Sequence, residues 1–206
     1  AGLDDVLEEY RAQQSVVLAG TLAPPARVED EIELETMNNI VGGTFGGRLN
    51  MNLREDKHWS YGAGSLLQGA RAQRLFLAYS SVQGDKTADT VAEMLSEMKG
   101  MLGARPVTTE ELEKAKQQQI FELPGSHETM NAVGNLFGDL LQLGLPLNFY
   151  DSYVSRVSSL TTADIETAAK SLLDPANMVW MVVGDRAAIE PALHTLGIGE
   201  IVAVET

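Results

Sequence analysis

The stretch from residue 61 to residue 82, YGAGSLLQGARAQRLFLAYSSV, decides the fold class. It predicts two strands, over 61–69 and 73–82, because β-branched, aromatic and other apolar residues flank a turn signal near Gly69 and Ala70. Strands joined by so short a turn pair antiparallel, whereas parallel strands need a long crossover connection. The sheet of this protein is therefore expected to be mainly antiparallel.

The rest of the chain shows mostly helical patterns, which are grouped rather than alternating with strands. Helices are expected over 29–40, 49–54, 86–101, 108–121, 128–143, 148–157, 161–173 and 187–196, and short strands over 16–20, 178–183 and 201–204. This order predicts an α+β two-layer sandwich with the helices packed on one face of the sheet. No linker-like stretch interrupts the chain, so residues 1–206 are expected to form a single domain.

The composition excludes several classes of function. Lys and Arg number 15 against 29 Asp and Glu, and the resulting net charge of -14 disfavours a nucleic-acid partner. No apolar run reaches the roughly 18 residues that a membrane span requires. Cysteine is absent, which excludes disulfides and thiolate chemistry. The chain begins Ala-Gly, and we expect it to be processed or cut from a longer polypeptide.

The sequence does not show the metal-binding or nucleophile motifs that are usual in hydrolytic enzymes. The three histidines, His58, His127 and His194, are isolated from one another, and Glu190 lies four residues before His194 without a third ligand in view. A catalytic zinc needs three protein ligands and an open position. The sequence also has no GxSxG motif, so a serine nucleophile is not indicated. By itself, this chain is predicted to bind no metal.

A glycine-rich segment, GGTFGG at 42–47, resembles a phosphate cradle only superficially. It lacks the Gly-Lys-Ser/Thr of a P-loop, and it follows a helical pattern rather than the strand that precedes a dinucleotide fingerprint. We interpret it as a loop in which the backbone approaches another segment closely, which glycine permits.

Arg54 and Tyr61 lie seven residues apart, shortly after this loop. Arginine offers a rigid fork of donors and tyrosine offers one phenolic donor. Together they suit holding a carbonyl oxygen, or an oxyanion whose nucleophile comes from elsewhere. Alternatively, Arg54 pairs with Glu55 or Asp56, and Tyr61 is a core aromatic with its hydroxyl at the rim. The residue types alone leave both interpretations open.

A wider pattern surrounds these two residues. The sequence LNMNLRE at 49–55, followed by SYG at 60–62, resembles the second-domain signature of the M16 (pitrilysin-type) zinc metallopeptidases. The segments AQQS at 12–15 and MNNIVGG at 37–43 are similar to the opening strand and first helix of that domain, and 178–185 to its late strand ending in Gly-Asp. The resemblance covers nearly the whole chain.

The resemblance implies half of an active site. In this family two homologous α+β domains face each other across a chamber, and one of them binds zinc through an HxxEH motif and a distal Glu. The other domain supplies an Arg and a Tyr, which implies that Arg54 holds a substrate carbonyl and Tyr61 stabilises the oxyanion. It also implies a substrate-binding loop formed by Gly43, Phe45, Gly46, Gly47 and Arg48.

The chain departs from the complete family pattern because it contains no HxxEH. Zinc is therefore expected on a partner domain, in the same polypeptide or in another, and the substrate is expected to be a peptide or an unfolded polypeptide. A bacterial periplasmic or envelope location is what the family suggests. Two alternatives stay open: a catalytically inactive assembly domain, like the core subunits of respiratory complex III, and a free-standing peptide-binding module.

Overall fold

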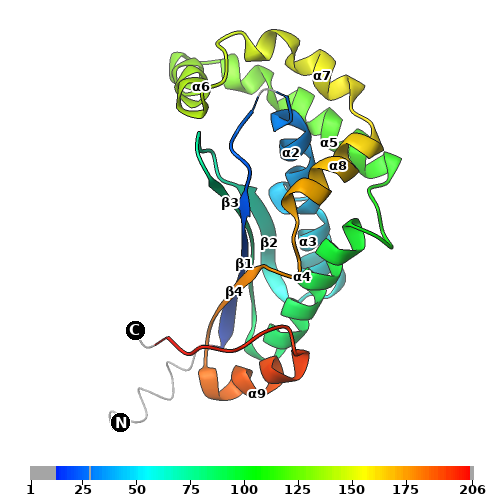
Figure 1. Cartoon of the computed structure of the whole chain (residues 1–206), viewed down its shortest axis with the longest axis vertical. Helices are drawn as coiled ribbons and strands as arrows, with labels where there is room; N and C mark the ends of the chain where they lie inside the picture. Colours follow the sequence, from blue (N-terminus) through cyan, green and yellow to red (C-terminus); the bar gives the residue numbers. More distant parts are fainter. Residues whose placement is uncertain (1–12, 28, 205–206) are drawn as a thin grey trace.

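The computed structural model describes residues 13–27 and 29–204, except the side chain at position 126, and shows one sheet with helices against it (Figure 1). The sheet has four strands in the order β2-β3-β1-β4. They are β1 (Gln14–Ala23), β2 (Ser60–Leu67), β3 (Arg74–Gln83) and β4 (Val179–Val183). All three pairings are antiparallel, and β2 and β3 form the hairpin that the sequence predicted. The α+β prediction is confirmed.

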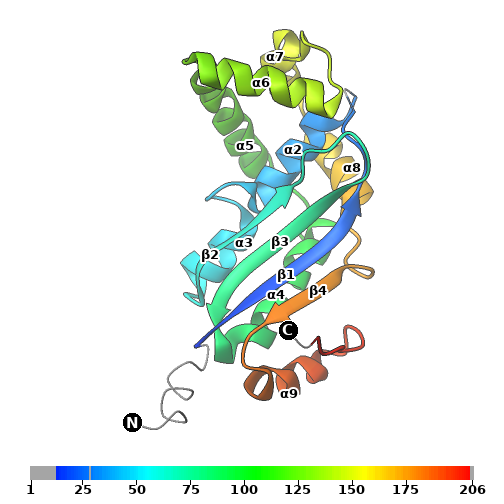
Figure 2. The ribbon, with the colours of Figure 1, turned by 90° about the vertical axis from the view of Figure 1, so that its left-hand side faces the viewer.

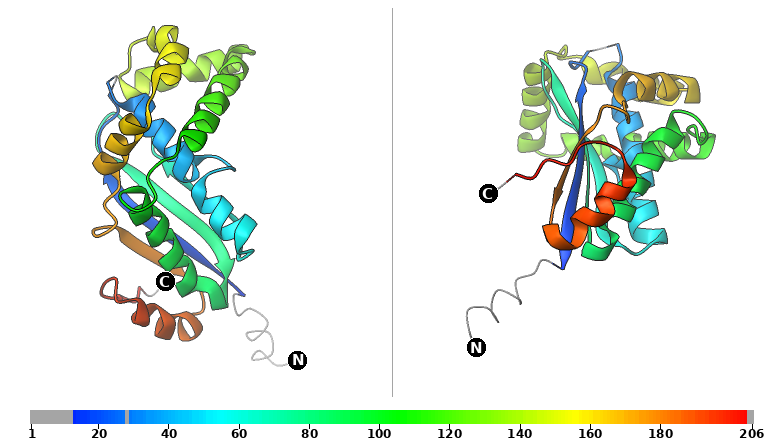
Figure 3. Two further views of the ribbon diagram at one scale, coloured as in Figure 1. Left: turned by 90° about the vertical axis from the view of Figure 1, so that its right-hand side faces the viewer. Right: turned by 60° about the horizontal axis from the view of Figure 1, so that its bottom comes forward.

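The helices follow the predicted pattern closely. They are α2 (Glu31–Asn38), α3 (Arg48–Asn50), α4 (Thr87–Met101), α5 (Thr109–Glu122), α6 (Met130–Leu143), α7 (Tyr153–Ser159), α8 (Thr162–Leu172) and α9 (Arg186–Leu196). Shorter turns are η1 (Asn39–Gly43), η2 (Met51–Asp56), η3 (Gly84–Lys86), η4 (Pro124–His127) and η5 (Phe149–Ser152). Figures 1 and 3 show α2, α3, α4, α5 and α8 on one side of the sheet. Among the described helices, none is long and apolar enough to cross a bilayer.

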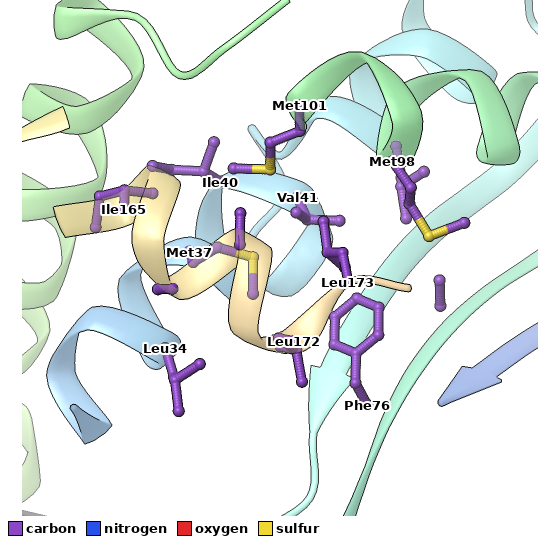
Figure 4. Packing of buried hydrophobic residues seen from close by; sticks show 14 of the residues in the cluster. Leu34, Met37, Ile40, Val41, Phe76, Met98, Met101, Ile165, Leu172 and Leu173 are labelled. Carbon is purple, nitrogen blue, oxygen red and sulfur yellow. The ribbon is translucent and has the colours of Figure 1, made fainter. Parts of the chain in front are cut away.

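The core lies between the sheet and these helices. Alternate residues of β1 and β3, such as Val17 and Phe76, are fully buried, because successive side chains of a strand point to opposite faces. In Figure 4, side chains from α2, α4 and α8 converge on Phe76. Beside this core lies a buried ion pair, in which Arg74 Nη2 donates to Glu31 Oε2 at 2.7 Å.

The other face of the sheet is apolar and largely uncovered. We call it the open sheet face; it consists of Val16, Leu22, Leu66, Leu75, Tyr79, Val179, Met181 and Val183, which are 38–74% exposed. Figure 2 looks onto this face, where α6 crosses beyond the hairpin turn. Arg71 of that turn holds α6 by donating from Nη2 to the Leu141 carbonyl at 2.8 Å.

Several predicted elements differ from the structure; among them, the helix predicted at 49–54 is divided into α3 and the π-helical turn η2. The strand predicted at 201–204 is wrong: these residues are irregular and pair with none of the four strands, and a strand needs a partner for its backbone groups. β1 is longer than the predicted 16–20, because it pairs with β3 along its whole length. The helix predicted at 148–157 is divided into η5 and α7.

Candidate functional site

The glycine-rich loop is packed tightly onto β2. α2 continues into η1, a π-helical turn, and the chain then folds back so that Gly47 lies against Gly42. A Cβ on Gly47 would lie 2.7 Å from the Gly42 Cα, and a Cβ on Gly42 would lie 2.7 Å from the backbone nitrogen of Ser65. No side chain fits either position without backbone movement. The glycines therefore serve close backbone approach, as the sequence interpretation expected.

Asn50 connects this loop to the strand, and sequence reasoning did not identify it. Its Nδ2 donates to the Phe45 carbonyl at 2.8 Å, while its Oδ1 accepts from the Ala63 amide at 3.3 Å. One buried side chain thus fixes the loop tip relative to β2. Asn50 lies within the segment 49–55, but its role could not be read from the sequence, because it depends on two segments that meet only in the folded chain.

Arg54 lies at the surface beside this loop. Its guanidinium carbon is 4.7 Å from the centroid of the Phe45 ring, and its side chain is 40% exposed. The local pairing considered from the sequence is weak: Arg54 Nε lies 3.5 Å from Glu55 Oε1, and both side chains are about equally exposed. Exposed ion pairs of this kind contribute at most about 1 kcal/mol, so this pair leaves Arg54 able to engage a ligand.

Tyr61 is 84% exposed on β2, so it is not a core aromatic. Ser60 pairs with Val82 and Gly62 pairs with Ser81, which leaves Tyr61 as an extra residue in a β-bulge. Bulges are over-represented near active sites, where they redirect a side chain. The second sequence interpretation of Tyr61 therefore fails.

The backbone between Arg54 and Tyr61 departs from regular helix and strand geometry at several points. Arg54 lies in the π-helical turn η2, and His58 adopts a left-handed φ of 57°, which is uncommon for a residue other than glycine. The His58 Nδ1 lies 3.0 Å from the Arg54 carbonyl oxygen. Such departures cluster at functional sites because the surrounding structure has to hold them in place.

Arg48 is placed differently from the rest of the predicted substrate-binding loop. Its Nε donates to Glu111 Oε1 at 2.6 Å, and its Nη atoms donate to the carbonyls of Arg105 and Pro106. Burial disfavours ionised Glu111, but hydrogen bonds from Arg48 and Thr108 outweigh this and lower its pKa. With a side chain only 12% exposed, Arg48 acts as an internal clamp, and we leave it out of the proposed site.

The other predicted loop residues are divided between surface and interior. Gly43, Phe45 and Gly46 are exposed, and the Phe45 ring is at the surface with 63% of the residue accessible. Gly47 is buried beneath them. The structure thus brings Phe45 and Arg54 together on one surface.

The described residues do not fit a zinc site. Over residues 13–27 and 29–204, no group of three or more His, Asp or Glu side chains is gathered in a way that could hold a metal ion. His58, His127 and His194 belong to separate parts of the fold, namely the loop before β2, η4 and α9.

The molecule is thus a two-layer α+β domain with an exposed Arg and Tyr on an irregular loop-and-strand segment. Residues 3–119, more than half of the chain, match the family model of the peptidase M16 inactive domain, and the chain belongs to that family. The resemblance found in the sequence is confirmed.

Relatives are distant in sequence. The chain is 21% identical over 158 residues to the "Non-peptidase homolog YmxG" of Helicobacter pylori, covering 77% of this chain and 36% of the relative. A peptidase M16 inactive domain from Pseudomonas fluorescens superposes with a TM-score of 0.74 at 23% identity, covering 84% of this chain and 41% of that one. A protease from Helicobacter pylori gives 0.74 at 19% identity, covering 82% and 41%. The chain therefore spans well under half the length of these three relatives.

Proposed function

We propose that this domain is the non-zinc half of a zinc metalloendopeptidase and contributes Arg54 and Tyr61 to a peptide-hydrolysing site. The observation that carries the proposal is the exposure of both side chains: Tyr61 is 84% exposed and Arg54 40% exposed. An aromatic hydroxyl on a bulged strand and a guanidinium on a neighbouring π-helical turn are suited to a ligand that approaches from outside the domain.

In this proposal a second M16 domain carries HxxEH and zinc, which supplies Lewis-acid activation of water when bound there. Arg54 donates hydrogen bonds to a backbone carbonyl of the bound peptide and fixes its position. Tyr61 donates a hydrogen bond from its phenolic hydroxyl to the oxyanion that develops on the scissile carbonyl. Preorganised donors of this kind stabilise the transition state more than the ground state.

The open sheet face supports pairing with a second domain. An antiparallel sheet normally leaves one face in water only when that face is polar, whereas this one carries eight exposed apolar side chains. Exposed apolar patches of this kind mark interaction surfaces. Because the relatives are more than twice as long as the stretch they share with this chain, we propose that the HxxEH domain covers the open sheet face.

A second candidate function is an assembly domain without catalysis. The Helicobacter relative is named a non-peptidase homolog, which favours this alternative. In that case the open sheet face still binds a paired domain, but Arg54 and Tyr61 contact no substrate. A free-standing peptide-binding module would instead bind extended peptides without any partner.

The test is a peptide-cleavage assay on the full natural protein together with its second M16 domain, with and without a zinc chelator. Cleavage that the chelator abolishes and added zinc restores supports the peptidase proposal. Stable pairing without cleavage of any peptide in a diverse library contradicts it and supports the assembly role. Micromolar peptide binding by residues 1–206 alone would support the third alternative.

A further inference from the structure

The β-bulge in β2 decides which way Tyr61 points. Ser60 lies opposite Val82, whose side chain is buried against the helices, and Gly62 lies opposite Ser81, which is exposed on the other face. Paired residues of an antiparallel ladder share a face. Without the extra residue, Tyr61 would take the place opposite Val82 and its ring would turn toward the helix layer, since a one-residue slip reverses the faces.

The hydroxyl of Ser60 lies at the centre of this bulge. It accepts a hydrogen bond from the Gly62 amide at 3.0 Å, and it lies 2.7 Å from the carbonyl oxygens of both Gly62 and Ser81. With one hydrogen, it donates to one of these carbonyls at a time. The hydroxyl of Ser80, which is fully buried, donates to the Ser60 Oγ at 3.0 Å. Ser60 thus joins both ends of the bulge to β3.

We propose that Ser60 is the positioning residue for Tyr61, with Ser80 as its buried support. This inference rests on the proposed function, in which the Tyr61 hydroxyl contacts the reacting carbonyl. Backbone groups that lose ladder partners at a bulge need other partners, and the Ser60 hydroxyl supplies them. Ser60 itself does not contact substrate. It acts by keeping the bulge in place, so that the ring of Tyr61 faces outward.

Ser65 provides a matched control on the same strand. It is 5% exposed, and its hydroxyl donates to Asn38 Oδ1 at 2.8 Å. Ser65→Ala removes a buried hydroxyl from β2 without touching the bulge, so it reports the general cost of such a change. Ser60→Thr keeps a hydroxyl at the bulge and serves as the conservative variant.

The experiment is a double-mutant cycle on the full protein paired with its HxxEH domain, measuring kcat and KM for peptide cleavage. Ser60→Ala is expected to lower kcat about tenfold or more, with Ser60→Thr and Ser65→Ala close to the wild type. In a Tyr61→Phe background, Ser60→Ala is expected to change kcat by less than about twofold, because both changes act through one hydroxyl. Ser80→Ala is expected to lower kcat less than Ser60→Ala does.

The outcomes distinguish the proposed role of Tyr61 in peptide cleavage from the positioning role of Ser60. If Tyr61→Phe leaves kcat unchanged, the proposed role of Tyr61 is wrong. If Tyr61→Phe lowers kcat while Ser60→Ala behaves like Ser65→Ala, or remains fully additive with Tyr61→Phe, the positioning role is overturned. Amide hydrogen exchange gives a readout independent of activity: Ser60→Ala should accelerate exchange at Gly62 while Ser65→Ala does not, and equal protection at Gly62 in both variants would contradict the inference.

Discussion

The guanidinium of Arg54 lies over the ring of Phe45, with 4.7 Å between the guanidinium carbon and the ring centroid. Phe45 is at the tip of the glycine-rich loop, and Arg54 comes from the following helical turn. A cation held over an aromatic face at an exposed site gains about 0.5–1 kcal/mol. We infer that Phe45 holds the arginine in the orientation in which its donors meet a peptide.

Phe45→Leu is expected to raise KM about two- to fivefold in the assembled enzyme, which is the factor that corresponds to 0.5–1 kcal/mol. kcat should change less, because the pair orients a binding group. Steady-state kinetics on a peptide substrate measure both. Phe121→Leu is the control, since Phe121 is 83% exposed on α5. Equal KM values for Phe45→Leu and the wild type would contradict this role.

Arg48→Ala is expected to reduce stability and leave substrate binding intact. The change leaves Glu111 and two backbone carbonyls without their charged donor, and a hydrogen bond to a charged group contributes about 1.5–3 kcal/mol. Urea unfolding should show a loss of about 2 kcal/mol or more. Arg186→Ala is the matched control, because its pair with Glu190 is exposed and such pairs contribute about 0.3–0.5 kcal/mol.

A rise in KM for Arg48→Ala at a temperature where the variant is fully folded would show that Arg48 contacts substrate after all. The local sequence does not predict the structural role of Arg48, because its partner Glu111 is 63 residues away along the chain. The resemblance placed Arg48 in the loop by its position in the motif, whereas its partners come from α5 and the segment before it.

Local signals in the sequence predicted local structure well. The hairpin was visible from its turn and its apolar pattern. Thr108 and Thr161 were recognised as helix starts, and both begin helices through capping boxes with Glu111 and Asp164. These features depend on residues within a few positions of each other, so the local sequence is enough to predict them.

Features that arise from long-range packing were not predictable. The π-helical turns, the left-handed His58 and the bulge at Tyr61 result from fitting a loop onto a strand. The strand expected at 201–204 was wrong because apolar composition does not provide a pairing partner. The substrate-contacting loop and the envelope location remain predictions.

Glu35 is expected to make the free energy of unfolding of this domain depend on pH. The residue Glu35 is exposed overall, but desolvation of its carboxyl among α2, α5 and α7 raises its pKa from 4.5 to about 7. A hydrogen bond from the Tyr153 hydroxyl, at 3.2 Å, opposes this rise, and the charges of Glu31 and Glu122 add to it. In the folded state Glu35 therefore keeps its proton to higher pH than in the unfolded chain.

Because the folded pKa is the higher one, the protonated carboxyl contributes stability that is fully present below pH 4.5 and is lost as the pH rises through about 7. The free energy of unfolding should fall across this window in the wild type, relative to Glu35→Gln. Urea titrations at several pH values measure the difference, with exposed Glu128→Gln as the control. A constant difference between wild type and Glu35→Gln from pH 4.5 to 7 would contradict the assignment.

Met181→Glu is expected to weaken pairing with the HxxEH domain without unfolding this one. Met181 is 59% exposed at the centre of β4 on the open sheet face, so a carboxylate there stays in water until a partner covers it. Burying an unpaired charge in an interface is costly. Binding of the two domains, measured by calorimetry, should weaken at least tenfold.

Val202→Glu is the matched control for that surface. Val202 is 72% exposed in the irregular segment after α9, which pairs with none of the four strands. Equal weakening by both variants would indicate a general effect of added negative charge. Unchanged binding in Met181→Glu would place the pairing surface elsewhere.

The most direct test of the central claim is turnover by Arg54→Ala and Tyr61→Phe in the protein assembled with its zinc-bearing domain. Loss of one oxyanion donor typically lowers kcat by about 10²–10³. We predict a fall of this order for Tyr61→Phe, a large loss of kcat/KM for Arg54→Ala, and unchanged zinc content in both. Wild-type turnover in both variants would contradict the account and leave the domain a role in assembly only.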